Sequence, residues 1–241
     1  MNVNISGSGQ IAPGQYDTVK ISGSGKLEGP VRCNAFSSSG ASRGAELECS
    51  GAVKISGSSS FTRGIQAGEL SVTGALSCGN DLQVSRELNC SGSLECGGSL
   101  RCNSLKLSGE AEVDGDVEAE AVKVSGSLDC TGLLNAETIL ITGAGMRIGS
   151  IGGGSITIHR AAALGKMAKV PLLSTIIKTI SGKVEVSGSI EGDSLELENV
   201  HCPSVSGRVV VIGPDCRIDV VQYSESVEIS PKATVGRSEQ I

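Results

Sequence analysis

The sequence predicts an all-β protein: a single-domain parallel β-helix, which is a solenoid with three faces, about 17 residues per rung and one insertion. Two observations carry this prediction, a regular Ser-Gly or Thr-Gly repeat and apolar columns at fixed distances from it. The glycines of these pairs are Gly7, Gly23, Gly40, Gly57, Gly74, Gly92, Gly109, Gly126 and Gly143. Such a repeat is typical of a solenoid, in which each turn packs mainly on its neighbours.

The first strand of each rung lies just before the glycine. Apolar side chains stand four and two residues before it, and the residue between them is mostly polar. The first column holds Val3, Val19, Phe36, Val53, Leu70, Leu88, Leu105, Val122 and Ile139, and the second holds Ile5, Ile21, Ser38, Ile55, Val72, Cys90, Leu107, Val124 and Ile141. This alternation indicates a strand with one buried side.

Two more strands complete each rung. A weaker one follows the glycine, with pairs such as Leu76 and Cys78 or Leu94 and Cys96. A third has apolar columns eight and ten residues after the glycine, which Leu47 and Cys49 join one residue early. The glycine marks a corner, where we expect it to supply backbone dihedrals that other residues resist. Turns of 16 to 18 residues without a strict sixfold pattern favour a right-handed helix.

The repeat divides the chain into three parts: regular rungs over residues 1–160, an insertion over 161–182, and C-terminal rungs over 183–241. His159 and Arg160 stand where the next corner is expected. We assign the following corner to Gly188, with Val184 and Val186 as the apolar pair before it, and the last corner to Pro231.

The insertion differs in composition, since it combines three lysines with apolar residues and has no acidic residue. A loop or short helix packed on the solenoid is the favoured interpretation. The alternative is a contact with a membrane surface or a partner, because basic and apolar side chains together suit an interface. Its candidate contact residues are Lys166, Lys169, Leu172, Leu173, Ile176 and Ile177.

Charge and composition narrow the function classes. The net charge is −6, which argues against binding of nucleic acid to a basic face. The first ten residues, MNVNISGSGQ, lack the charged and apolar regions of a secretory signal. Nine cysteines without such a signal fit a reducing compartment. We therefore expect a cytoplasmic protein, which the insertion would allow to associate with a membrane.

No residue pattern predicts catalysis, a cofactor or a metal site. The cysteines fall in the inward columns and form no Cys-x-x-Cys pair, so we interpret them as small apolar core residues. Cys78 and Cys96 are expected one rung apart, within reach of a disulfide in principle, but a cytoplasmic setting argues against one. His159 and His201 would form an acid–base pair only if the fold joined them, and we favour corner or loop positions for both.

Several rungs have sequences that resemble bactofilins, the polymer-forming cytoskeletal proteins of bacteria. They are VKISGSGKLEG (19–29), VKISGSSS (53–60) and VKVSGSLDCTG (122–132), and IEGDSLELENV (190–200) and the segment 209–236 are similar to a Gram-positive branch of bactofilin-like proteins. The resemblance implies a right-handed β-helix that assembles end to end into nonpolar filaments without nucleotide. It also implies a scaffold at the membrane for cell-wall and morphogenetic partners.

The expected function is therefore that of a self-assembling scaffold, not an enzyme, with itself as a partner and with a membrane surface or cell-envelope proteins as further partners. Val3 and Ile5 place an apolar pair almost at residue one, so we expect the first rung to be a self-association surface. The alternatives are a carbohydrate-active β-helix enzyme, which the few aromatics disfavour, and a cell-surface adhesin, which the apparent lack of a signal and the inward cysteines disfavour.

Overall fold

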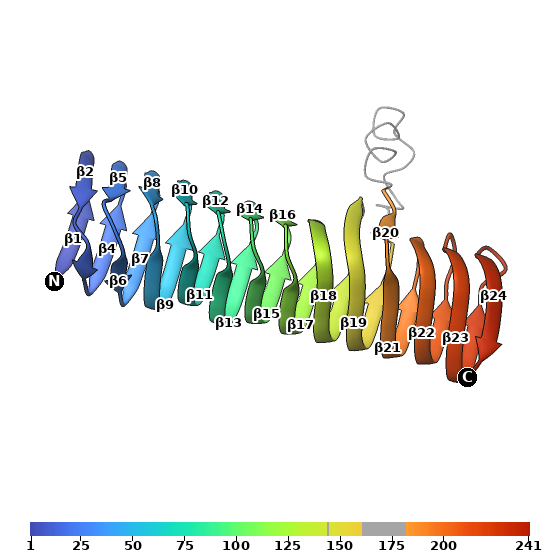
Figure 1. Ribbon diagram of the computed structural model, residues 1–241. Helices are drawn as coiled ribbons and strands as arrows, with labels where there is room; N and C mark the ends of the chain where they lie inside the picture. The colour runs from blue at the N-terminus through green and yellow to red at the C-terminus, as the bar shows by residue number, and fades with distance from the viewer. Residues whose placement is uncertain (144, 161–181) are drawn as a thin grey trace, which may run out of the picture. The chain divides into compact units, whose positions relative to one another are not determined.

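The computed structural model describes residues 1–143, 145–160 and 182–241 (Figure 1). In these ranges the chain forms strands joined by tight corners, and it contains no helix. Neighbouring rungs pair in parallel throughout the registers given below. The predicted all-β parallel solenoid is thus confirmed, while its right-handed sense stays a prediction. The chain divides into two compact units, 1–120 and 121–241, which are described separately.

Unit 1 begins with rungs of three separate short strands. They are β1 (Asn2–Ile5), β2 (Ser8–Ile11), β3 (Gly14–Gln15), β4 (Thr18–Ile21), β5 (Ser24–Leu27), β6 (Val31–Cys33), β7 (Ala35–Ser38) and β8 (Ala41–Gly44). In each later rung, one long strand runs through the third corner and forms both the third face of that rung and the first face of the next. The strands are β9 (Leu47–Ile55), β10 (Ser58–Phe61), β11 (Ile65–Val72), β12 (Ala75–Cys78), β13 (Leu82–Cys90), β14 (Ser93–Cys96), β15 (Leu100–Leu107), β16 (Glu110–Val113) and β17 (Val117–Val124), the last of which contains the division between the units.

The register of unit 1 follows the predicted columns. On the first face the backbone partners are Val3, Val19, Phe36, Val53, Leu70, Leu88 and Leu105, in that order along seven rungs. On the third face Val31 pairs with Leu47 and Leu47 pairs with Ile65, so the shorter rung at Leu47 keeps the register. The inward side chains of these columns are buried from the second rung onward, and they form the core.

The corner glycines have a different cause from the one expected. None of them has a positive φ. Among the glycines of the described residues, only Gly14 and Gly145 have one. Instead, the corners stack so closely that a Cβ on Gly23 would overlap the carbonyl oxygen of Gly7, and Gly40 stands in the same relation to Gly23. The glycine repeat therefore reflects close approach between rungs, and the expectation of unusual dihedrals was wrong.

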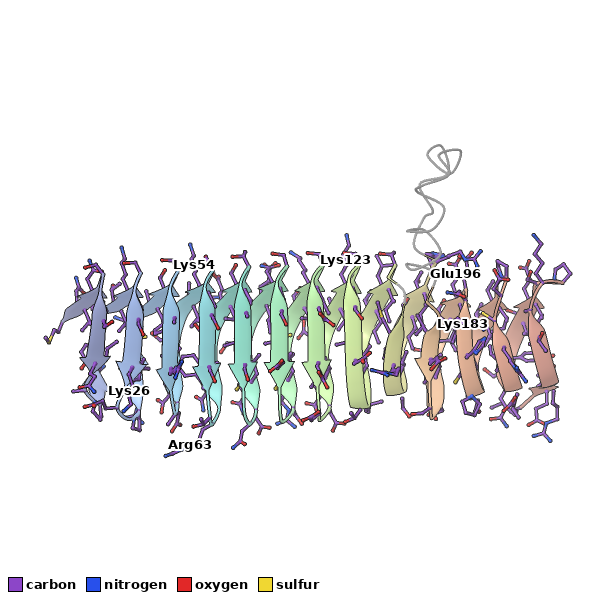
Figure 2. All side chains as sticks on the ribbon, turned by 90° about the horizontal axis from the view of Figure 1, so that it is seen from above. Lys26, Lys54, Arg63, Lys123, Lys183 and Glu196 are labelled. Atoms are coloured by element: carbon purple, nitrogen blue, oxygen red, sulfur yellow. The ribbon has the colours of Figure 1, made fainter. Side chains whose placement is uncertain are left out.

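Outward side chains alternate with buried ones along most strands of unit 1. Figure 2 shows Lys54 and Lys26 projecting from opposite edges of unit 1, with Arg63 on the same edge as Lys26. Cross-rung ion pairs link several outward charges, such as Arg101 with Glu118, whose Nε and Oε2 atoms are 2.8 Å apart. These pairs lie on the surface, so they contribute little to stability individually.

Most strands of unit 2 are longer and cover two or three faces, but one of them has only three residues. The strands are β18 (Ser127–Ile141), β19 (Met146–Ile158), β20 (Val184–Val186), β21 (Ser189–Leu197), β22 (Val200–Ile212), β23 (Arg217–Ile229) and β24 (Thr234–Gln240). Ile139 pairs with Ile156, Ile156 with Leu195, and Leu195 with Val210 on the first face. The predicted inward columns at Ile139 and Ile156 are thus confirmed.

The structure corrects the phase of the chain after the insertion. Val184 pairs with Met146 and Val186 with Ile148, so both lie on the second face, after the corner rather than before it. Gly188 stands beside Gly149 at the next corner, and its N–H donates to the Gly149 carbonyl at 2.7 Å. The assignment of Gly188 to the first corner was therefore wrong, because Ser-Gly pairs occur at more than one corner of this solenoid.

All but one of the extra residues consequently belong to one corner. Ile151 pairs with Ile190, 39 residues later, whereas Leu134 pairs with Ile151 after 17. The added length falls between Ile158 and Val184, at the corner that His159 and Arg160 open. The predicted insertion at 161–182 lies almost wholly outside the described residues, but its point of attachment is thereby fixed.

The last rungs take a register that the sequence left open. Ile190 pairs with Val205 and Val205 with Val221, while Ile212 pairs with Ile229. Asn199, Pro214 and Pro231 occupy the corner where Gly stands in unit 1, as predicted for Pro231. Asn199 has φ 57° and Asp215 has φ 63°, which these residue types tolerate better than most.

Candidate functional site

The first candidate site is the open edge of the first rung in unit 1. Strand β1 pairs with β4, β2 with β5, and β3 with β6, and within the described residues no strand pairs with their other sides. The backbone N–H and C=O groups along that edge therefore face outward. An edge of this kind is a template for a further strand from another chain.

Both predicted self-association residues lie at this edge. Val3 is in register with Val19 and Ile5 with Ile21. Val3 is half-buried although Val19 is fully buried, because no rung covers Val3 from outside. Ile5 is 9% exposed, and its side chain lies against Gly9, where an added Cβ would come within 3.2 Å of it. The edge thus presents apolar surface beside unpaired backbone.

The last rung of unit 2 has a different chemical character. Strand β24 pairs with β23, and its side chains form polar contacts within the rung and with the rung before it. The Gln222 amide donates to Glu239 Oε1 at 2.9 Å, and Arg237 Nη2 lies 3.4 Å from the same oxygen. Val235 is half-buried and Ile229 is 38% exposed. This end offers isolated apolar side chains among charged groups.

A second feature is the attachment point of the insertion in unit 2. The Arg160 backbone N–H donates to Glu198 Oε2 at 3.2 Å, and the Arg160 guanidinium lies 2.9 Å from Asp215 Oδ2. The Asn199 side-chain amide donates to the Gly182 carbonyl at 2.9 Å. Two consecutive residues, Glu198 and Asn199, therefore hold the chain on either side of the insertion.

The contact residues predicted within the insertion lie outside the described residues. They are Lys166, Lys169, Leu172, Leu173, Ile176 and Ile177.

The two histidines have separate surroundings. His159 lies at the corner before the insertion, with its ring nitrogens 3.8 Å from Glu198 and 3.9 Å from Glu196. His201 lies in β22, in register with Glu185 and Arg217, and burial lowers its pKa. The predicted corner position is confirmed for His159, while the prediction of a corner or loop was wrong for His201.

A third feature is a groove of about 350 Å³ on unit 1, over the corner between the third and first faces. Its walls come from five consecutive rungs and include Tyr16, Asn34, Ser50, Gln66 and Ser85, and its inner side reaches Cys33, Cys49 and Ala67. Small residues leave this space open. A Cβ on Gly68 would collide with backbone atoms of Ser50 and Gly51, so this rung comes very close to its neighbour.

Polar contacts between rungs fix the rim of the groove. The Arg32 guanidinium forms two hydrogen bonds to Glu48, at 2.7 Å from Nε to Oε2 and 3.1 Å from Nη2 to Oε1. The Asn34 amide donates to Asp17 at 2.9 Å, and the Ser50 hydroxyl donates to the Asn34 amide oxygen at 3.1 Å. The groove is therefore shaped by side chains that already have partners.

Two thiols lie side by side beneath this rim. Cys33 and Cys49 are backbone partners on adjacent strands, and they are 5% and 3% exposed. Their shared hydrogen bond lowers the pKa of Cys49 to about 7, against the opposing effect of burial and with help from the backbone of Gly51 and Phe36. The same bond, together with burial, raises the pKa of Cys33.

Cys78 and Cys96 form a comparable pair on the second face, in register as predicted. Their thiols donate mainly to backbone carbonyls, that of Cys78 to Arg63 at 3.1 Å and that of Cys96 to Asn80 at 3.3 Å. Burial raises the pKa of both, for Cys78 to about 11. The column that joins Cys33 to Cys49 could be read from the sequence, but the groove above it could not.

Comparison with known proteins gives two partial relatives. The chain is 37% identical over 67 residues to the uncharacterized protein YhbE of Bacillus subtilis, a match that covers 28% of each chain. It is 32% identical over 85 residues to the uncharacterized protein YhbF of the same organism, over 35% of this chain and 31% of the relative. The chain thus matches less than a third of the length of either relative.

No protein-family model matches the sequence, and no solved structure matches the chain. Within the part of the chain that the structure describes, there is also no helix long and apolar enough to cross a membrane.

Proposed function

We propose that the protein is a structural scaffold that assembles with copies of itself through the open edge of its first rung. The observation that carries this proposal is the row of unpaired backbone groups on β1, β2 and β3, beside the half-buried side chain of Val3 and its inward neighbour Ile5. Repeat proteins that remain single usually cover such an end with polar residues. The resemblance of the rungs to bactofilins supports the same function.

Strand pairing across this edge would satisfy backbone groups and bury apolar area together. Each new backbone hydrogen bond contributes about 1 kcal/mol, and three short strands offer several of them. Val3 would bury more apolar area in such a contact, because it is half-buried whereas its partner Val19 is fully buried. The partner is a second copy of this chain.

The variant that tests the proposal is Val3→Glu combined with Ile5→Glu, which sets carboxylates at the edge. We expect the unaltered protein to form oligomers or filaments that grow with concentration in analytical ultracentrifugation and electron microscopy, and the double variant to lose the contact at this end. Lys20→Glu, an exposed change on the neighbouring strand β4, is the matched control and should leave assembly unchanged. Circular dichroism shows whether each variant keeps its β-structure. Unchanged sedimentation of a folded double variant contradicts the proposal.

A second variant, Val235→Glu on β24, shows which ends of two copies contact each other. If like ends meet, as the bactofilin resemblance implies, each single-end variant stops at a dimer. If the first rung of one copy meets the last rung of another, either variant gives monomers. In both arrangements, a protein that carries the substitutions at both ends should remain monomeric.

A further inference from the structure

The spacing of Cys33 and Cys49 suits a covalent bond between them. The two residues are backbone partners on the parallel strands β6 and β9, and both side chains point inward on the same face. Neighbouring strands lie about 4.8 Å apart. Disulfides join residues whose Cα atoms are roughly 4.4–6.8 Å apart, so the spacing of adjacent strands falls within the range that a disulfide requires.

The groove gives these thiols a route to solvent despite their low exposure. Cys33 and Cys49 both line it, and its volume of about 350 Å³ lies within the range of pockets that hold small molecules. The ion pair between Arg32 and Glu48 at the rim joins two opposite charges. The opening therefore suits a small polar molecule without requiring a charge of either sign.

Cys78 and Cys96 provide an internal comparison. They are also backbone partners on adjacent parallel strands and are equally buried. However, their thiols donate to backbone carbonyls, and neither residue lines the groove. Cys49 also has a backbone acceptor, the Ala52 carbonyl at 3.6 Å. The two pairs thus share their spacing and differ in access and in the hydrogen bond between the thiols, which acts only on the pKa values of Cys33 and Cys49.

We propose that Cys33 and Cys49 form a thiol–disulfide exchange site, reached through the groove, whose substrate class is a low-molecular-weight disulfide. The Cys49 thiolate attacks one sulfur of the small disulfide, which forms a mixed disulfide and releases one small thiolate. The Cys33 thiol loses its proton and attacks the Cys49 sulfur, which forms the Cys33–Cys49 bond and releases the second small thiolate. The two protein thiols are oxidised by two electrons, and the small disulfide is reduced to two thiols.

The proton balance of the pair supports these roles. A thiolate, not a thiol, is the attacking species. The hydrogen bond from Cys33 stabilises the Cys49 thiolate and lowers the pKa of Cys49, while it raises the pKa of Cys33. Cys49 is therefore the first nucleophile and Cys33 the residue that resolves the mixed disulfide. This inference does not depend on self-assembly.

The test uses the full chain and hydroxyethyl disulfide, a small neutral probe. After timed exposure, free thiols are alkylated and the linkages are mapped by mass spectrometry. We expect a Cys33–Cys49 disulfide to form at least tenfold faster than a Cys78–Cys96 disulfide. Equal rates for the two pairs, or no Cys33–Cys49 bond after prolonged exposure, overturn the proposal, and this measurement needs no variant.

Two single variants assign the roles. Cys33→Ser should trap the probe as a mixed disulfide on Cys49, because the resolving thiol is absent. Cys49→Ser should show at least tenfold slower modification at Cys33. A mixed disulfide that accumulates on Cys33 at the unaltered rate contradicts the assignment of the nucleophile. Circular dichroism of both variants confirms that each keeps its β-structure.

Discussion

The rings of Phe36 and Phe61 meet edge to face inside unit 1, with their centroids 6.1 Å apart and their planes at 70°. The two residues come from different faces of the solenoid and are each 1% exposed. Small residues nearby make room for them. Ser42 and Ser59 are buried with a hydrogen bond of 2.6 Å between their hydroxyls, and a Cβ on Gly44 would lie 3.3 Å from the Phe61 ring. Large and small side chains therefore compensate within a core of nearly constant width.

Truncation of Phe61 should open a cavity that the stacked rungs cannot close. We expect Phe61→Ala to lower the free energy of unfolding by about 3–5 kcal/mol. Urea titration followed by circular dichroism measures this. Lys54→Ala, at an exposed position, should change it by less than about 0.5 kcal/mol. A loss below about 1 kcal/mol for Phe61→Ala would show that the core repacks.

Stacking at the corners predicts different effects on stability for two glycines that occupy the same corner in different rungs. Gly57→Ala places a methyl group against the carbonyl oxygen of Gly40, whereas Gly7 belongs to the first rung and has nothing within 4 Å of an added Cβ. We expect Gly57→Ala to destabilise the fold by about 1–3 kcal/mol, as overpacking does. Gly7→Ala should leave the midpoint of thermal unfolding of the monomer nearly unchanged. Similar losses for both variants would point to dihedral requirements instead.

The exchange reaction proposed for Cys49 should depend on pH in a recognisable way. Because the pKa of Cys49 is lowered to about 7, its rate of alkylation should rise as the pH increases through 7 and level off above it. The charged groups at the groove, Arg32 and Glu48, are paired with each other. Cys33→Ala removes the hydrogen-bond donor and should shift the profile to higher pH, while Cys33→Ser keeps a donor and should shift it less. An unaltered profile in Cys33→Ala would mean that the donor has no such effect.

Acid should weaken the rung contact between Arg32 and Glu48. The hydrogen bond and charge of Arg32 lower the pKa of Glu48 below its ordinary value of 4.5. The contribution of the pair is therefore fully present above pH 4.5, and it is lost as the pH falls below that value and Glu48 becomes protonated. Glu48→Gln should reduce the loss of stability between pH 5 and pH 3, in thermal unfolding at each pH. Glu28→Gln, which removes an exposed glutamate from the same unit, is the control, and an equal effect there would contradict a specific role for the pair.

The columns of the sequence predict the core well because a solenoid turns local order into spatial order. Val31, Leu47 and Ile65 could be aligned even though one rung is a residue shorter, since their alternation with polar residues survives. The phase after the insertion could not be obtained in the same way. The apolar–polar–apolar pattern of Val184 to Val186 fits any of the three faces. Only the pairing with Met146 and Ile148 assigns these residues to the second face.

The candidate sites also differ in how far the sequence could predict them. Val3 and Ile5 were found because an end of a repeat is visible as the first apolar pair. The groove beside Cys33 and Cys49 was missed, because its opening depends on how far small residues such as Gly68 let successive corners approach. A concave surface of this kind has no signature in the spacing of apolar residues. The cysteine column shows which thiols are neighbours but not which of them solvent reaches.

In unit 1, the contact between a glycine and the carbonyl oxygen of the preceding rung recurs at the first corner, so successive rungs present nearly the same surface to one another there. A tandem duplication of one rung's codons would therefore lengthen a unit by about 4.8 Å without creating a new kind of contact. A deletion of one rung would shorten it by the same step. Such a chain can evolve as a molecular ruler, whose length is adjusted by copying while its core chemistry stays the same.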